Sequence, residues 1–416
     1  MSFNLTYNKK KIVNDPVYGF ISIGDDLLFD LIEHPWFQRL RRIRQLGLSD
    51  YVYPGAHHSR FHHALGALHL MNLAIESLKS KGHQISDEES LGAKVAILLH
   101  DIGHGPFSHA LEHSIIQGIH HERLSLLFMQ ELNIEFSGQL DMAIAIFTDR
   151  YPKKFLHQLV SSQLDVDRLD YLNRDSFYTG VTEGTVGSDR IIKMLEVVDD
   201  QLVVEEKGIY SLEKFLLARR LMYWQVYLHK TVLSAENLLV HVLRRAKNLA
   251  SEEVVVNAAD SLSYFLKMKN ESLLALDTEE LIRRFALLDD YDIFASAKDW
   301  INHSDPILSE LSKRLTYRRL FKIRLDSSPV SVAVFEDLQS RWMKGGYSQE
   351  ETDYFVFKGE ITNSAYNTEE ERINILMKNG QVLDIREASD QLRLSVLSES
   401  VKKYFYCYPK ELESVK

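Results

Sequence analysis

Adjacent imidazole and carboxylate side chains follow a run of apolar residues in the segment Leu98–His109. His100 and Asp101 come directly after positions typical of a buried helix, and glycines and a proline then end that helix. Burying a neighbouring imidazole and carboxylate is costly unless something pairs them. A divalent cation does so, because both groups offer lone pairs of suitable hardness. The alternative is an exposed helix end capped by the aspartate, but His104 and His109 in the same turn favour a metal site.

A second histidine lies on a helix predicted to begin after Ser59, whose hydroxyl can cap it. On that helix His63 shares a face with small and apolar residues three, four and seven positions further on. These residues are Gly66, Ala67 and Leu70. His62 falls on a more polar face, and we expect it to face solvent. His63 is therefore predicted to point into a close-packed interior, either as a metal ligand or as a hydrogen-bonded core residue.

A third cluster, Asp165–Asp175, is dense in carboxylates. On a helix, one face of it would carry Asp167, Tyr171, Arg174 and Asp175, while leucines anchor the rest. A solvated charged face is the usual explanation of such a run. The tyrosine within the acidic face makes a functional face an equally good interpretation.

Other catalytic patterns are weak or missing. His109–His113 matches the H-x-x-E-H pattern of a zinc protease class, in which histidines four apart share an ion. His109 directly follows a Gly-Pro break, which argues against one continuous helix there. The sequence contains no G-x-x-x-x-G-K-[ST] and no G-x-G-x-x-G string, so neither a P-loop nor a dinucleotide fingerprint is available.

Apolar periodicity predicts a mainly α-helical body that would position these side chains. The predicted helices are Leu27–Leu46, Arg60–Leu78, Leu91–His100, His121–Glu131, Ser161–Asp175 and Ser211–Leu249. The sequence pattern changes near residue 325. After it, aromatic and β-branched residues typical of strands occur in Tyr354–Lys358. Ile373–Met377 and Val382–Ile385 flank Asn379-Gly380, a strong hairpin signal. We therefore predict a catalytic core over 1–250, a helical extension over 251–325 and a small α+β appendage over 326–416.

The composition of the 416 residues, 45% hydrophobic and 26% charged, is that of a globular protein. With 59 acidic and 49 basic residues the net charge is -10, so no global positive field attracts nucleic acid. The single cysteine, Cys407, excludes an intrachain disulfide and a multi-cysteine zinc site, and it fits a reducing compartment. The chain has no apolar signal-peptide core and no membrane-length apolar run. We expect a cytoplasmic protein without membrane association.

The order of His63, His100-Asp101 and Asp167 resembles the H…HD…D signature of the HD superfamily. Further strings resemble its dNTP triphosphohydrolases of the SAM-and-HD-domain branch, although no SAM domain is recognisable. These strings are Val13–Gly19, Pro35–Arg41, Gln45–Gly47, Tyr53–Ala56, Ser59–Phe61, His100–His109 and Asp165–Tyr171. The resemblance covers about residues 10 to 325 and implies an HD-domain helical bundle.

The resemblance implies a reaction that splits a dNTP into a deoxynucleoside and intact triphosphate. It implies a divalent metal, with Mn, Fe, Mg, Zn and Ni all open, held by His63, His100, Asp101 and Asp167. The catalytic histidines beside it would be His104, His109 and His121, with His109 as the candidate general acid. Matching positions assign phosphate contacts to Arg60, Arg168 and Arg219, contacts to the sugar 3′-hydroxyl to Gln45, Tyr171 and Asp175, crowding of the 2′-position to Leu46, and sugar packing to Tyr227.

Several positions depart from the branch. Tyr223 stands where the branch has a histidine, and Arg168 stands where it has a lysine. The branch is activated by nucleotides bound between subunits, which implies at least a dimer. The matching regulatory positions are Asn14, Gln38, Arg41, Arg318 and Lys322. Glu33 replaces an aspartate that helps to read guanine, which puts guanine selectivity in question.

Two other classes of function stay open. An HD metal site can also serve a 5′-nucleotidase or a hydrolase of cyclic or hyperphosphorylated nucleotides, since a fold does not fix a substrate. A nucleotide-binding or single-stranded nucleic-acid-binding regulator with weak catalysis is the third hypothesis. The complete set of metal-ligand types argues against that regulator, and no residue pattern supports nucleic acid as a partner.

Overall fold

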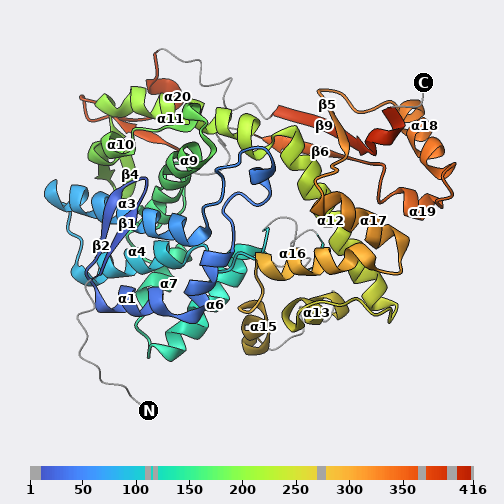
Figure 1. Cartoon of the computed structure of the whole chain (residues 1–416). Helices are drawn as coiled ribbons and strands as arrows, with labels where there is room; N and C mark the ends of the chain where they lie inside the picture. Colours follow the sequence, from blue (N-terminus) through green and yellow to red (C-terminus); the bar gives the residue numbers. More distant parts are fainter. Residues whose placement is uncertain are drawn as a thin grey trace.

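Long helices form the body of the protein (Figure 1). The computed structural model describes residues 11–107, 114–115, 120–268, 278–363, 372–390 and 401–413. The helices before residue 200 are α1 Asp26–Glu33, α2 Pro35–Gln38, α3 Arg60–Ser80, α4 Asp87–Leu99, α6 His121–Glu135, α7 Asp141–Phe147, α8 Lys154–Val160, α9 Val166–Thr179 and α10 Ser188–Met194. Those after it are α11 Ile209–Met222, α12 Lys230–Ser251, α13 Asp260–Lys267, α15 Thr278–Phe285, α16 Asp290–Asp299, α17 Pro306–Thr316, α18 Val332–Met343, α19 Gln349–Thr352 and α20 Ile385–Ala388.

Helix α3 packs against both α4 and α9. Its apolar residues are buried on most of its faces, among them Leu65, Leu68 and Met71. Ser59 caps it, and the His62 ring completes a capping box with Ser59. His62 is therefore half-buried and engaged, which corrects the expectation that it faces solvent. This buried helix is the rigid element on which His63 sits.

The predicted helix Leu27–Leu46 is wrong, because the chain breaks at His34. Helix α1 ends there, α2 begins at Pro35, and Arg39–Arg42 continues as a 3-10 turn. A residue before proline is driven out of the helical region, and His34 accordingly has ψ 136°. The His34 ring then caps α2 by accepting the Trp36 N–H.

The predicted helix Ser211–Leu249 is also interrupted. Helix α11 ends in a π-helical turn, Tyr223–Tyr227, and α12 begins after His229, which is extended and caps the new helix. A π turn widens the backbone at a single point, frequently at a functional site. The predicted helix Ser161–Asp175 begins later, at Val166, because Asp165 is its N-cap and accepts the Arg168 N–H. The helices predicted at Arg60–Leu78, Leu91–His100 and His121–Glu131 are confirmed; each is longer than predicted, although α4 ends one residue earlier, at Leu99.

Small sheets flank the helices. Strands β1 Lys11–Asp15 and β2 Gly19–Ile23 form an antiparallel hairpin. Strands β5 Lys322–Asp326, β9 Val401–Tyr408 and β6 Phe357–Asn363 form an antiparallel sheet in the order β5-β9-β6. The predicted hairpin around Asn379-Gly380 is confirmed as β7 Asn374–Leu376 and β8 Val382–Asp384, with Gly380 at φ 85°.

That hairpin does not stay with the other C-terminal strands (Figure 1). Strand β7 pairs in parallel with β4 Gln201–Glu205, which itself pairs with β3 Leu195–Val198. The C-terminal residues thus add to two separate sheets, one beside α11 and one beside α12. The division into three domains remains a prediction. Among the residues that the structure describes, no helix is long and apolar enough to cross a membrane.

Candidate metal centre and active site

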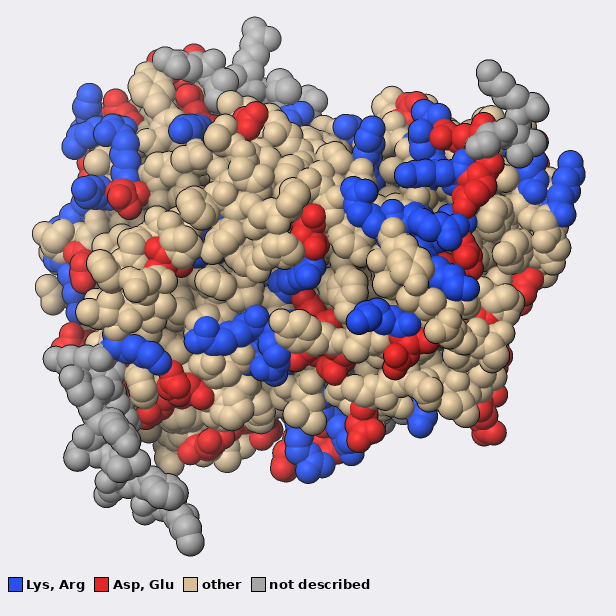
Figure 2. Space-filling view, viewed as in Figure 1, with Lys and Arg blue, Asp and Glu red and all other residues tan. Residues whose placement is uncertain are grey.

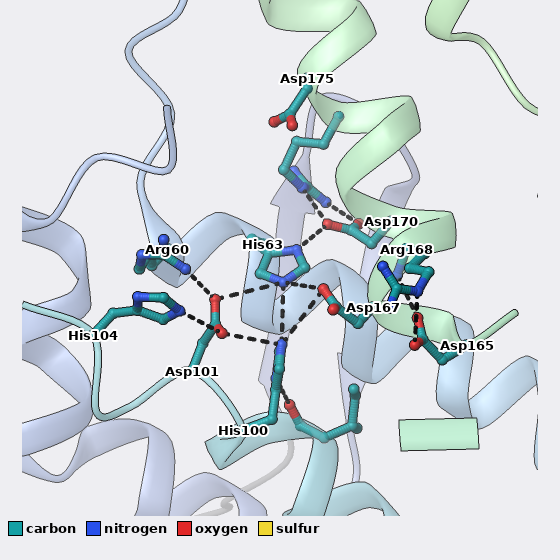
Figure 3. Close-up of polar contacts among 12 residues, drawn as sticks. Arg60, His63, His100, Asp101, His104, Asp165, Asp167, Arg168, Asp170 and Asp175 are labelled. Atoms are coloured by element: carbon teal, nitrogen blue, oxygen red, sulfur yellow. Dashed lines mark hydrogen bonds and ion pairs between the residues drawn. The ribbon is translucent and has the colours of Figure 1, made fainter. Parts of the chain in front are cut away.

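Four side chains with metal-binding chemistry converge from different helices (Figure 3). His63 comes from α3, His100 caps the end of α4, Asp101 follows it, and Asp167 lies in the first turn of α9. The two imidazole Nε2 atoms are 3.4 Å apart. Asp167 Oδ1 lies 3.0 Å from Nε2 of His63 and 3.5 Å from Nε2 of His100.

The outer ring nitrogens of both histidines are fixed by hydrogen bonds. Nδ1 of His63 donates to Asp170 at 2.7 Å, and Nδ1 of His100 donates to the Ile97 carbonyl at 2.6 Å. Because each Nδ1 carries a proton, each Nε2 can offer its lone pair to the centre of the cluster. This pattern of outer hydrogen bonds is typical of metal-binding histidines.

The electrostatics of the cluster also favour a cation. Burial opposes charge on the His63 ring, but the carboxylates of Asp167 and Asp170 outweigh it and raise the pKa of His63 to about 10. Burial likewise opposes charge on Asp101, yet His100, His104 and Arg60 hold the pKa of that carboxyl well below its usual range. The side chains therefore create a site where positive charge is strongly stabilised.

These observations test whether a metal fits. One ligand atom each from His63, His100 and Asp101 lies within 4.8 Å of the others, which is the spacing that a shared ion needs. Imidazole nitrogen and carboxylate oxygen suit several divalent metals, so the donors leave the identity of the metal open. The residues present fit a divalent metal.

Asp170 links this cluster to the interior of the protein. Its carboxylate accepts from His63 and, with two bonds of 2.9 Å, from Arg174, which also reaches Asp15 at 2.7 Å. Gly66 explains how the helices come so close: a Cβ there would lie 2.0 Å from Asp170 Oδ1 and 2.1 Å from Arg174 Nη2. The arginine that the sequence placed on a functional face is therefore a buried support for His63.

Asp170→Asn should weaken both folding and metal binding. Removing one partner of a fully buried charge pair costs about 3 kcal/mol or more, because Arg174 loses its main counter-charge. Loss of a partner that orients a metal-binding histidine typically lowers metal affinity about 10–100-fold. Urea denaturation and metal titration measure the two effects, with exposed Asp189→Asn as the control. Unchanged metal affinity in Asp170→Asn would show that His63 is not a ligand.

A cavity of about 510 Å³ opens beside the cluster. It brings together many of the residues predicted as a site, namely Gln45, Leu46, Arg60, Asp101, His104, His121, Asp167, Arg168, Tyr171, Asp175 and Tyr227. Tyr223 lines it as well, from the π-helical turn. Other lining residues were not predicted from the sequence, among them Ser49 and Glu236. Their signal was absent, because they are isolated in sequence and meet only through the fold.

Two of the three arginines predicted to bind phosphate line this cavity, and the third does not. Arg60 lines the cavity and contacts Asp101 (Figure 3), so it is tied to the metal cluster. Arg168 lines the cavity and donates through Nε to the Ser162 carbonyl at 2.7 Å. Arg219 is buried and donates to Gln163 Oε1 at 3.1 Å, but it is not part of the described cavity wall.

The structure describes two of the three predicted catalytic histidines, His104 and His121. His104 stacks on His121 with ring centroids 3.9 Å apart, and its Nε2 lies 3.1 Å from Asp101 Oδ1. Burial and the neighbouring Arg60 lower the pKa of His104 to about 3, so its ring is neutral. His109, and with it the H-x-x-E-H pattern of His109–His113, lies outside the described residues.

The other end of the cavity carries hydroxyl and carboxylate groups. The carboxylate of Asp175 accepts from Tyr227 at 2.8 Å and from the buried ring of His58 at 2.7 Å. Tyr171 and Tyr227 lie edge to face, with centroids 6.2 Å apart. Gln45 Oε1 is buried here without a hydrogen-bond partner among the described residues. This end is suited to binding a polar ring through its hydroxyl groups.

The loop that carries His104 is anchored by residues that the sequence did not single out. The guanidinium of fully buried Arg39 donates to the carbonyls of Ile102 and His104, each at 2.8 Å. On the far side of the loop, the carboxylate of Asp290 accepts the N–H of Phe107 at 3.2 Å. These anchors come from distant parts of the chain and fix both ends of the turn that enters the cavity.

The predicted regulatory residues form two groups. In the first, Arg41 Nε donates to Gln38 Oε1 at 2.7 Å, Glu33 accepts from Lys11 at 2.5 Å, and Asn14 lies on β1. In the second, Arg318 and Lys322 line a cavity of about 270 Å³ together with Lys230 and Lys410. Figure 2 shows Lys and Arg gathered over β5 and β9, mixed with Asp and Glu. In the described part of the chain no contact joins the two groups.

Comparison with known families agrees with this fold. Residues 60–175 match the HD domain, and residues 186–284 match the HD associated region. A crystal structure of a phosphohydrolase from Bacteroides thetaiotaomicron shares 52% identity with this chain, covers 96% of it and 99% of its own chain, and superposes with a TM-score of 0.92. The chain belongs to the HD-domain family and is a phosphohydrolase of that family.

Curated relatives refine the placement. The uncharacterized protein YwfO of Bacillus subtilis is 32% identical over 97% of this chain and 93% of its own length. The deoxynucleoside triphosphate triphosphohydrolase SAMHD1 homolog of Dictyostelium discoideum is 32% identical over 61% of this chain. The aligned region spans 54% of that relative's length, so about half of it is compared.

Proposed function

We propose that the protein hydrolyses deoxynucleoside triphosphates to a deoxynucleoside and intact triphosphate. The observation that carries this proposal is the combination in a single cavity of the Asp101 and Asp167 carboxylates, two arginines and a polar end with hydroxyl groups. The paired Asp175 and Tyr227 add polar groups that would bind a sugar hydroxyl. The similarity to a SAMHD1 homolog supports the same substrate class.

We propose that His63, His100, Asp101 and Asp167 hold the divalent metal. When bound, such an ion supplies Lewis acidity toward a phosphate oxygen and lowers the pKa of water. Arg60 and Arg168 would bind the phosphate chain, because planar guanidinium matches phosphate oxygens bidentately. Arg219, behind the cavity wall, would assist only if the wall rearranges on binding.

Proton transfer is assigned to the histidines. His109 would donate a proton to the departing 5′-oxygen as general acid. His104 is neutral and stacked on His121, so this pair would orient rather than donate. Arg39 and Asp290 would hold the turn that carries His104 at a constant distance from Asp101.

Sugar recognition is assigned to the opposite end of the cavity. Gln45, Tyr171 and Asp175 would bind the 3′-hydroxyl, and Tyr227 would pack on the ring. Leu46 is 9% exposed and lines the cavity, so it can crowd the 2′-position. Selection against ribonucleotides would then arise from a steric clash.

Leu46→Ala should raise the ratio of GTP to dGTP hydrolysis by about tenfold, since a small steric clash in a pocket is typically worth 1–3 kcal/mol. The measurement is kcat/KM for both nucleotides. Leu48→Ala is the control, because Leu48 is equally apolar and buried but is not a lining residue of this cavity. An unchanged ratio in a folded Leu46→Ala enzyme would remove Leu46 from sugar selection.

The decisive test of the proposed function is product analysis. The pure protein is incubated with each dNTP and Mn²⁺, and the products are resolved by chromatography. Inorganic tripolyphosphate with deoxynucleoside is the expected result. Orthophosphate or pyrophosphate would instead favour the second candidate, an HD phosphohydrolase acting on another nucleotide, which the same metal cluster could serve.

We further propose a homo-oligomer, at least a dimer, with a regulatory nucleotide between subunits. The support is that Arg41, with Gln38, and Arg318, with Lys322, form two groups that no contact joins in the described part of one chain. A triphosphate bound by both groups would hold two subunits together. Light scattering with and without dGTP and metal should show nucleotide-promoted assembly that Arg318→Glu abolishes. A monomer under all conditions would refute this part.

A further inference from the structure

His58 contacts two residues at the polar end of the cavity beside the metal cluster, although it is not itself a described lining residue of that cavity. Its Nε2 donates to Asp175 Oδ1 at 2.7 Å, and its backbone carbonyl accepts the Gln45 N–H at 3.0 Å. Asp175 and Gln45 both line the cavity. His58 therefore lies behind the part of the wall that is proposed to bind the sugar.

Packing fixes the ring of His58 in one orientation. The residue is 1% exposed, and its ring stacks on that of Tyr178 in α9, with centroids 4.4 Å apart and an interplanar angle of 17°. The loop before it passes close to α9 at Gly55, where a Cβ would lie 2.5 Å from the Tyr178 carbonyl oxygen. Glycine permits this close approach of two backbones. The direction of the His58 Nε2–H bond is therefore set by the fold.

The contacts of Asp175 leave it able to accept a further hydrogen bond. Oδ1 accepts from His58, and Oδ2 accepts from the Tyr227 hydroxyl at 2.8 Å. Burial and the Asp175 carboxylate hold the pKa of Tyr227 well above its usual value, so this hydroxyl remains a donor. A carboxylate offers about four lone-pair positions. Two donors thus fix the plane of the carboxylate and leave it free to accept from a substrate hydroxyl.

The second nitrogen of the His58 ring shows that packing alone does not explain this histidine. Nδ1 is buried and has no hydrogen-bond partner among the described residues. Buried polar atoms are paired in the great majority of cases. An apolar ring would fill the same space without an unpaired nitrogen. The bond from Nε2 to Asp175 is the polar interaction that accounts for a histidine at this position.

We propose that His58 is a positioning residue for recognition of the sugar 3′-hydroxyl. Its ring orients the Asp175 carboxylate, its carbonyl fixes the backbone of Gln45, and it does not touch the substrate. This inference rests on the proposed function, in which Asp175 and Gln45 bind that hydroxyl.

The test compares the dNTP that is hydrolysed fastest with its 2′,3′-dideoxy analogue, which lacks the 3′-hydroxyl. His58→Phe keeps a stacking ring and the backbone contact to Gln45 but removes the donor to Asp175. It should raise KM for the dNTP about tenfold, the usual worth of a hydrogen bond to a charged group. The inhibition constant of the dideoxy analogue against the dNTP should change about twofold or less, because that analogue makes no contact for Asp175 to lose.

Two further variants separate the hydrogen bond from packing. His58→Gln should recover most of the affinity, because its amide nitrogen reaches the place of the imidazole Nε2 and is also a donor. His58→Asn is one methylene shorter and should not recover it, and it replaces His58→Phe if that variant does not fold. His57→Phe is the matched control, since His57 is the adjacent histidine and is exposed.

An equal loss of affinity for the dNTP and its dideoxy analogue would overturn the proposal, because a merely structural role affects both nucleotides alike. An unchanged KM in folded His58→Phe would overturn it as well, as would a His58→Gln enzyme no better than His58→Asn. Failure of the proposed function has a different sign: the wild-type products then contain orthophosphate or pyrophosphate, and the comparison of the two nucleotides still tests His58.

Discussion

Asp167→Ala should bind almost no metal and should lose hydrolytic activity by about 10³-fold or more. The Asp167 carboxylate reaches both imidazole nitrogens of the cluster from the first turn of α9. Metal catalysis is worth several kcal/mol, and each 1.36 kcal/mol is a factor of ten in rate. The fold should survive, because the side chain is partly exposed and the helices around it supply the burial.

Bound metal, hydrolysis rate and thermal midpoint should be measured on one preparation of the variant. Asp189→Ala is the matched control, since it removes an exposed carboxylate from the next helix. A variant that loses its metal but keeps the wild-type rate would separate the cluster from the reaction. Full metal content in the variant would instead remove Asp167 from the ligand set.

His109→Gln should lower kcat by about 10²–10⁴-fold, the usual worth of a general acid, with metal content unchanged. Glutamine keeps a similar size and hydrogen bonding but cannot deliver a proton. KM should change little if the residue acts only on the departing oxygen.

His113→Gln is the matched control for His109, since both belong to the H-x-x-E-H pattern. Under the proposed role the His113 variant keeps its rate. If both variants instead lose metal together, the protease-like pattern describes the metal site, and the assignment to His63 and His100 is wrong.

The His/Asp cluster was predictable because each of its side chains carries a local signal. His63 stands on a small-residue helix face, His100-Asp101 ends an apolar helix, and Asp167 starts an acidic one. The structure brings these four side chains together, and their role as ligands remains a proposal. The order of these motifs along the chain, together with the resemblance, predicted the helical HD fold that the comparisons confirm.

The supports of the cluster were not predictable. Asp15 binds Arg174, although the two are 159 residues apart in the sequence. Arg39 binds the loop of His104 through backbone carbonyls. Carbonyl groups occur at every residue, so the sequence carries no sign of which ones an arginine will bind. Asp290 is 183 residues from Phe107 in the sequence, and only the folded structure shows that its carboxylate accepts the Phe107 N–H.

The helix breaks have a different explanation. Pro35 marks the end of α1 in the sequence, but apolar residues continue with helical period across it and predict one longer helix. The break at His229 has no comparable signal in the sequence. A histidine caps a helix only when its ring turns back to accept a backbone N–H, here that of Thr231. The break matters for the site, since it places Tyr223 and Tyr227 on a π turn facing the cavity.

The parallel pairing of β4 with β7 affects how the chain folds during synthesis and where it can be truncated. Val203 of β4 pairs with Asn374 of β7, which is synthesised much later. One edge of β4 therefore stays unpaired until almost the whole polypeptide has left the ribosome. At about 5–20 residues per second this interval is on the order of ten seconds. Exposed strand edges recruit other chains, so nascent or truncated forms that end before the hairpin should aggregate. Expression of the HD region for study should therefore retain residues 372–390, although they lie far from the metal cluster in sequence.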